Sequence, residues 1–327
     1  MPLLPQVPRA VRPAAGFLAA AAAATAVSTA ASPAAASAAI ASPAAVSPAL
    51  TSSAAGSSAA APPVRGQSAS TPVYFLHGID WNHGSAGDAQ INCESAWKAA
   101  EAALKDRGWT GDLITWGYYA KDTRCTRKVN GDLNTRIQEL GRRFAWDVYD
   151  HYTKNGQPVD VAAHSMGGLV VRAAIEGVKR YGKNKDWPDR LSIQDIVTFS
   201  TPHTGTSWAT SCTALKGWKQ CSDTRPGSGF LKWAGQNPQA DGGTDWTLIG
   251  ASDDDMITSG SATGMRAEHK SIYASGQGLE HSTIKNKGTG NTWKSKYTDD
   301  YGTTWKNRTG PGPLRLLYNA LYDGPAA

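Results

Sequence analysis

The sequence has little of the charge that nucleic-acid binding requires. Only 18% of its 327 residues are charged, and no run rich in lysine or arginine occurs beyond residue 70. The formal net charge of +6 falls to +3 once the three arginines of residues 1–70, a segment without any acidic residue, are left out. Because a nucleic-acid surface gathers basic residues on one face or stripe, the composition argues against this class of partner.

The sequence also lacks a cysteine pattern for metal binding. No C-x-x-C pair is present, and no histidine lies at ligand spacing beside a cysteine, which argues against a zinc site. The four cysteines are Cys93, Cys125, Cys212 and Cys221. Four cysteines allow three connectivities. Pairing of sequence neighbours favours the disulfides Cys93–Cys125 and Cys212–Cys221, which would form in an oxidising compartment.

No apolar run is long enough to span a bilayer comfortably. The Ala-rich stretch 14–27 follows two arginines and precedes small residues, with Ala36-Ser37-Ala38 as one of several A-x-A cleavage sites. This order is typical of a secretory signal peptide, and the weak hydrophobicity of alanine disfavours a membrane anchor. We therefore expect a signal peptide over residues 1–38, a disordered Ala/Ser/Pro-rich linker over 39–70 and a secreted protein.

From Thr71 onward, strand-like and helix-like segments alternate. Such alternation predicts an α/β fold, with a mostly parallel central sheet and helices on both faces, as one domain over residues 71–327. The predicted strands are 72–76, 112–118, 158–163, 193–199, 246–250 and 271–274. The predicted helices are 94–107, about 131–152, the segment after residue 165, and one that Pro313 opens.

The strongest chemical signal is the sequence Ala-His-Ser-Met-Gly-Gly over residues 163–168. It lies between a predicted strand and a predicted amphipathic helix, the context of a nucleophile elbow. We expect Ser165 to be the nucleophile, on a turn so tight that its neighbours at 163 and 167 must be small. The simpler alternative is an ordinary strand-to-helix turn with a capping serine.

A second signal, His77-Gly78-Ile79, follows the first predicted strand. An oxyanion hole needs one backbone N–H from the residue after the nucleophile and one from an early strand-to-helix loop. We expect Met166 to supply the first and Ile79 the second. His77 is expected to hold the loop in shape rather than to react.

Together these motifs resemble the small secreted bacterial triacylglycerol lipases and their class 2 relatives, in which alanine replaces the first glycine of G-x-S-x-G. The segment 201–206 is similar to the T-P-H-x-G-[ST] turn of many bacterial lipases. The resemblance covers roughly residues 71–282 and implies the α/β-hydrolase fold with a triad in the chain order Ser, Asp, His.

The resemblance also points to the acid and the base. In the family the acid precedes a hydrophobic pair, so Asp255, before Met256-Ile257, is the best match, with Asp253 and Asp254 as rivals. His281 follows the next predicted strand and is expected to be the base. His269 precedes that strand, which would place it at the wrong end of the sheet.

Two segments depart from the smallest family members. Residues 207–244 form a Trp-rich insert that is either a cap over the acyl pocket or a minor surface subdomain. Residues 285–306 form a Gly/Thr/Trp-rich excursion without a counterpart in the family.

These observations predict a serine hydrolase that cleaves carboxylic esters, as a lipase or carboxylesterase, through an acyl-enzyme. It would need no metal and no organic cofactor, act on an ester or lipid with transient contact to a lipid surface, and be a monomer. A cutinase-like polyester hydrolase, an acyltransferase, and a secreted binding protein on the same scaffold are the alternatives, since a fold does not fix a function.

Overall fold

The computed structural model describes residues 68–322, so the predicted signal peptide and almost all of the predicted linker lie outside the described residues. Within this part of the chain, no helix is both long and apolar enough to cross a membrane. The strands are β1 (Val73–Leu76), β2 (Leu113–Gly117), β3 (Arg127–Lys128), β4 (Val159–His164), β5 (Ile193–Phe199), β6 (Asp245–Ala251), β7 (His269–Tyr273), β8 (Trp293–Thr298) and β9 (Lys306–Gly310).

These strands form one sheet in the order β3-β2-β1-β4-β5-β6-β7-β8-β9. Neighbouring strands from β3 to β7 are parallel, whereas β8 and β9 continue the sheet as an antiparallel extension. The predicted mostly parallel sheet is therefore confirmed. Because parallel strands end at a common edge, the loops after β1, β4, β6 and β7 converge there.

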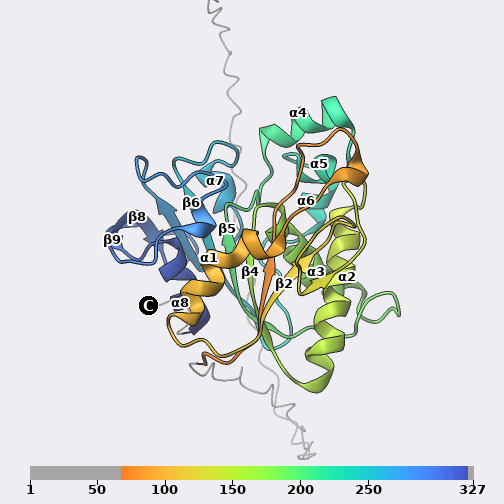
Figure 1. Ribbon diagram of the computed structural model, residues 1–327, viewed down its shortest axis with the longest axis horizontal. Helices are drawn as coiled ribbons and strands as arrows, with labels where there is room; N and C mark the ends of the chain where they lie inside the picture. Colours follow the sequence, from red (N-terminus) through yellow and green to blue (C-terminus); the bar gives the residue numbers. More distant parts are fainter. Residues whose placement is uncertain (1–67, 323–327) are drawn as a thin grey trace, which may run out of the picture. The chain divides into compact units, whose positions relative to one another are not determined.

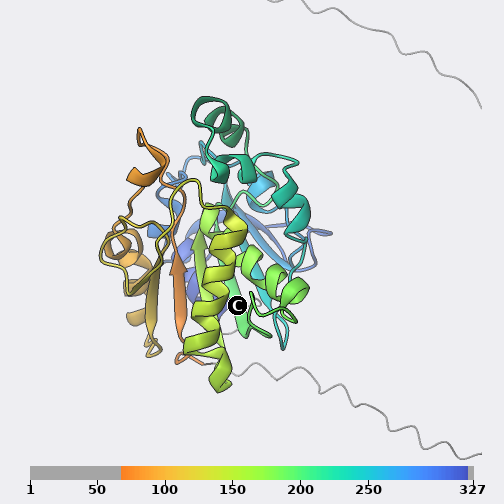
Figure 2. The same ribbon diagram turned by 90° about the vertical axis from the view of Figure 1, so that its right-hand side faces the viewer.

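Helices cover both faces of the sheet, as predicted (Figure 1). The longer ones are α1 (Cys93–Lys105), α2 (Ile137–His151), α3 (Met166–Tyr181) and α8 (Pro313–Tyr322). One apolar cluster joins Val73 and Phe75 of β1 to α1 and α8, and a second joins Tyr74 and Leu76 to α2 and α3. This split follows the two-residue period of a strand. In Figure 2, α2 lies in front of the strands.

The structure differs from the sequence-based expectation at the start of α2. Leu133 fits the helical spacing, but the helix begins only at Ile137. The reason is a local turn, in which the Asp132 carboxylate accepts hydrogen bonds from the Asn134 backbone and the Thr135 hydroxyl. Leu133 still packs into the core, from that turn.

The insert forms three short helices in the upper right of Figure 1, α4 (Ser207–Lys216), α5 (Lys219–Thr224) and α6 (Gly229–Trp233). Trp218, Phe230 and Leu231 are buried in the same cluster as α2 and α3. Both expected disulfides are present, Cys93–Cys125 and Cys212–Cys221. The second joins two cysteines nine positions apart within the insert and links α4 to α5.

Candidate active site

Ser165 lies on the sharp turn between β4 and α3, at the common edge of the parallel strands. Its backbone has φ 52° and ψ −130°, a conformation that non-glycine residues rarely adopt and that costs of order 1–3 kcal/mol. The turn is as tight as expected: a Cβ on Gly167 would lie 2.5 Å from the His77 carbonyl oxygen. The strained turn holds the Ser165 hydroxyl at the edge of the sheet.

His281 comes from the loop after β7 and reaches Ser165 from across the sheet edge. Its Nε2 lies 3.0 Å from the Ser165 Oγ. The rival His269 is the first residue of β7, at the opposite end of that strand, where its Nδ1 lies 3.2 Å from Asp299. Of the two histidines, only His281 contacts the serine.

The carboxylate beside His281 belongs to Asp254, and the expectation of Asp255 is corrected here. Asp254 Oδ2 lies 3.1 Å from His281 Nδ1, whereas Asp255 is exposed. Asp254 Oδ1 accepts the backbone N–H groups of Met256 and Ile257, at 2.9 and 2.7 Å. This turn folds Asp254 inward and leaves Asp255 facing solvent.

The environment of Asp254 favours its ionised form. Burial by itself would raise the pKa of this carboxyl, but the hydrogen bond and the charge of His281, with the N–H of Ile257, hold the pKa below its usual value. Asp253 plays a different part, because its carboxylate accepts the N–H groups of Gly276, Gln277 and Gly278, in the loop that carries His281. The three consecutive aspartates thus differ in their contacts, since Asp255 is exposed.

His164, just before the serine, supports the backbone of His281. Its Nε2 lies 2.8 Å from the His281 carbonyl oxygen. Burial, together with the nearby positive charges of His281 and Lys285, lowers the pKa of His164 well below its usual value. A neutral ring then donates from Nε2 to that carbonyl.

Of the two expected oxyanion donors, one is the chain neighbour of Ser165 and the other lines the same cavity. Met166 is the first residue of α3, and the first N–H groups of a helix have no acceptor within the helix. Ile79 lines the same cavity as Ser165. The intervening Gly78 must be glycine, because a Cβ there would lie 2.8 Å from the Cβ of Ser165.

A cavity of about 290 Å³ opens at the serine. Its lining is mainly apolar around the polar pair Ser165 and His281. The lining includes Ile79, Trp81, Ile91, Ala96, Met256 and Lys285. Residues of the insert are not part of the described lining, but Trp208 of α4 packs against Trp81 with ring centroids 5.0 Å apart.

Lys285 is a buried cation in this lining. Its Nζ donates to the Ala96 carbonyl at 2.7 Å and to Asn286 Oδ1 at 3.1 Å. Burial lowers the pKa of Lys285 from 10.5 to about 8. In the unfolded chain this lysine keeps its proton up to about pH 10.5, so between these two values the unfolded state binds more protons than the folded state.

The free energy of unfolding should therefore rise with pH between about 8 and 10.5 because of Lys285. Below pH 8 the buried charge should destabilise the fold by up to about 3 kcal/mol. Replacing Lys285 with methionine should remove this contribution to the pH dependence of the free energy of unfolding. Urea unfolding of wild type and variant at pH 7 and pH 10 checks this, and a stability difference that stays constant between these pH values would contradict it.

Within residues 68–322, one group has the spacing of metal ligands, namely His77, Cys93 and Asp122, whose ligand atoms lie within 4.8 Å of one another. The sulfur of Cys93 is bonded to Cys125. Both ring nitrogens of His77 already face oxygen atoms, of Gly78 and Asp122. These partners do not suit a metal ion.

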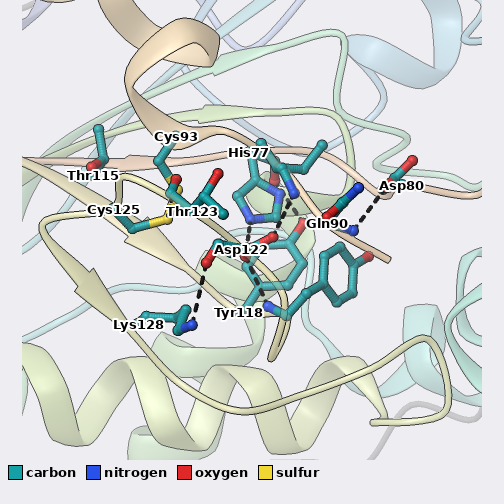
Figure 3. A network of polar contacts seen from close by, with 12 residues as sticks. His77, Asp80, Gln90, Cys93, Thr115, Tyr118, Asp122, Thr123, Cys125 and Lys128 are labelled. Atoms are coloured by element: carbon teal, nitrogen blue, oxygen red, sulfur yellow. Dashed lines mark hydrogen bonds and ion pairs between the residues drawn. A yellow bond between two sulfur atoms is a disulfide. The ribbon is translucent and has the colours of Figure 1, made fainter. Parts of the chain in front are cut away.

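Several residues of this region were not predicted from the sequence. Asp254 was only a rival of Asp255, and nothing in the spacing pointed to Asp122, Tyr118 or Lys285. Asp122 contacts His77, and the Tyr118 hydroxyl donates to the Gly78 carbonyl oxygen (Figure 3). A signal for Lys285 was available, since it lies four residues beyond His281 in a segment without a predicted role.

A comparison with known protein families finds a match for this chain. Residues 75–237 match a family described as "Putative serine esterase (DUF676)". No match was found among the curated proteins.

Several solved structures are similar to this chain. Phospholipase PlaB from Legionella pneumophila, in complex with thio-NAD, is 13% identical with a TM-score of 0.40, covering 59% of this chain and 44% of that chain. The mature lipase BlEst2 from Bacillus licheniformis is 18% identical with a TM-score of 0.37, covering 62% and 73%. A lipase-esterase related protein from Clostridium acetobutylicum is 11% identical with a TM-score of 0.40, covering 67% and 89%. This chain therefore spans less than half of the phospholipase chain.

The family match runs from the end of β1 through the elbow and β5, and its description agrees with the chemistry that a serine at such an elbow supports. With its mostly parallel sheet and helices on both faces, the chain has the architecture of the α/β-hydrolase fold, and its residues 75–237 are similar to a family described as serine esterases.

Proposed function

We propose that this protein hydrolyses carboxylic esters through a triad of Ser165, His281 and Asp254. The proposal rests on one observation above all, that His281 lies within hydrogen-bonding distance of both partners, 3.0 Å from Ser165 Oγ and 3.1 Å from Asp254 Oδ2. This is the arrangement of nucleophile, base and orienting acid that activates a serine hydroxyl.

In the proposed reaction, Ser165 Oγ attacks the ester carbonyl while His281 Nε2 takes the hydroxyl proton. The carbonyl oxygen becomes an oxyanion, which the backbone N–H groups of Ile79 and Met166 stabilise. His281 then gives the proton to the leaving alcohol. Water, activated by the same histidine, hydrolyses the acyl-enzyme and restores Ser165. Asp254 stays ionised and keeps the imidazole oriented.

The size of the cavity supports small substrates. About 290 Å³ is at the lower limit of ordinary ligand pockets, and its apolar lining suits a short acyl chain. We therefore propose a preference for short-chain esters. Secretion after removal of residues 1–38 is also part of the proposal, and two disulfides among the described residues support it.

A series of p-nitrophenyl esters tests both the activity and the chain-length preference. We expect kcat/KM to be highest for acetate or butyrate and to fall for octanoate and palmitate. Absence of turnover on every ester would overturn the proposed activity. A maximum at palmitate, or faster release of acid from a polyester film than from soluble esters, would instead favour a lipase or a cutinase-like enzyme and overturn the proposed substrate preference.

A further inference from the structure

A buried polar network around His77, Tyr118 and Asp122 lies outside the triad (Figure 3). Asp122 is at its centre, with a side chain that is fully buried. Its Oδ2 accepts His77 Nε2 at 2.9 Å and the Tyr119 N–H at 2.8 Å, and its Oδ1 accepts the Ile91 N–H at 2.7 Å. A carboxylate that accepts three donors is held in one position, and so is the His77 ring beside it.

The network ends on a single carbonyl group. His77 Nδ1 lies 2.7 Å from the Gly78 carbonyl oxygen, and the Tyr118 hydroxyl donates to the same oxygen at 2.8 Å. The Tyr118 hydroxyl also lies 2.7 Å from the His77 carbonyl oxygen, and its ring stacks on the His77 ring with centroids 4.0 Å apart. The His77 ring is thus held between the Asp122 carboxylate and the Gly78 carbonyl oxygen.

The Gly78 carbonyl and the Ile79 N–H belong to the same peptide unit. That unit is trans, as are all the peptide bonds of the described chain, so its C=O and N–H point in opposite directions. Donors that fix the Gly78 oxygen on the side of Asp122 therefore fix the direction of the Ile79 N–H on the other side. Gly78 itself lies next to the serine, since a Cβ on it would lie 2.8 Å from the Ser165 Cβ and 3.2 Å from its Oγ.

The Asp122 loop is itself anchored to α1. Thr123 exchanges backbone hydrogen bonds with this region: its N–H donates to the Ile91 carbonyl, and its carbonyl accepts the Cys93 N–H, both at 2.9 Å. The disulfide Cys93–Cys125 joins the same two segments covalently. The network thus rests on a rigid support, as precise alignment of a hydrogen-bond donor requires.

We propose that Asp122, His77 and Tyr118 are positioning residues that aim the Ile79 N–H at the oxyanion. The proposal rests on the proposed ester hydrolysis and deepens it. None of the three side chains needs to touch the substrate. Their effect should appear where negative charge develops on the carbonyl oxygen, and hardly at all in binding of the neutral ester.

Tyr118→Phe tests the proposal with the smallest structural change, because the stacked ring stays and only the hydroxyl is lost. We expect kcat on p-nitrophenyl butyrate to fall about tenfold or more, with KM within about twofold of wild type. Loss of a whole oxyanion donor costs about 100- to 1000-fold, and a donor that is only misdirected should cost less. Asp122→Asn should lower kcat further, since an amide group cannot accept all three N–H donors.

Two matched ketones distinguish a misdirected Ile79 N–H from a general distortion of the active site. An alkyl trifluoromethyl ketone adds the Ser165 oxygen to its carbonyl carbon; the π electrons move to oxygen as an oxyanion, and the serine proton passes to His281. The methyl ketone of the same chain length binds as a neutral ground state. The inhibition constant of the trifluoromethyl ketone should rise by the same factor by which kcat falls, while that of the methyl ketone should not change.

Tyr273→Phe is the matched control, because Tyr273 is equally buried and its hydroxyl also donates to a backbone carbonyl, that of Pro311, away from the cavity. It should leave kcat and both inhibition constants unchanged. The positioning role is overturned if kcat of Tyr118→Phe stays within twofold of wild type, or if the inhibition constants of both ketones rise by the same factor. A wild type that neither hydrolyses esters nor binds the trifluoromethyl ketone would overturn the proposed function instead.

Discussion

Replacing His281 with alanine should lower kcat for p-nitrophenyl butyrate by at least about 10⁴-fold, because a serine hydroxyl is a weak nucleophile without a base to take its proton. In the structure, His281 Nε2 lies 3.0 Å from Ser165 Oγ, close enough to take its proton. KM should change little, since the imidazole acts in the chemical step. Steady-state kinetics on the purified variant measures this, with thermal unfolding to confirm that the fold is kept.

His269→Ala is the matched control for that variant. This histidine is also buried, and it starts the strand that leads to His281, but it contacts acidic side chains at the other end of β7. It should lower stability somewhat and leave kcat within about twofold. If His269→Ala inactivates the enzyme and His281→Ala does not, our assignment of the base is wrong.

Replacing Asp254 with asparagine should lower kcat by about 10⁴-fold while leaving the fold intact. The asparagine oxygen still accepts the N–H groups of Met256 and Ile257 that Asp254 Oδ1 accepts now. Its NH₂ group then faces His281 Nδ1 and requires that nitrogen to be an acceptor. The ring proton moves to Nε2, where it faces Ser165 and prevents the histidine from acting as a base. Steady-state kinetics on p-nitrophenyl butyrate measures the loss.

Asp255→Asn removes a carboxylate from the neighbouring residue, and its side chain is exposed. It should leave kcat within about twofold. Asp253→Asn should lower kcat by a factor between those of the other two variants, since the Asp253 carboxylate holds the backbone of the loop that carries His281. If Asp255→Asn lowers kcat more than Asp254→Asn does, then Asp254 is not the acid that orients His281 in solution.

The central sheet and the elbow could be predicted because they depend on local patterns. The strands β1, β2, β4, β5, β6 and β7 lie within about two residues of the predicted ranges, since buried parallel strands appear as short apolar runs. The elbow requires small residues at fixed positions, and these are visible in a single sequence. The strand β8 also had a signal, because Trp293, Ser295 and Tyr297 alternate with lysines, but none of the predicted strands covers it.

The choice among the three aspartates could not be made from spacing. The hydrophobic pair Met256-Ile257 identified the right loop, but a one-residue shift in a tight turn reverses the direction of a side chain. Only the hydrogen bonds of the Asp254 carboxylate to that pair decide which aspartate turns inward. Asp122 was harder still, because it meets His77 across 45 residues of sequence.

The central claim is that Ser165 is the nucleophile, and its covalent capture tests this most directly. The wild-type protein is treated with a fluorophosphonate, whose phosphorus bonds to the serine oxygen as fluoride leaves, and the modified peptide is identified by mass spectrometry. We predict one adduct per chain, on Ser165, and none in Ser165→Ala. An unmodified wild type, or an adduct on another residue that persists in Ser165→Ala, would contradict this assignment.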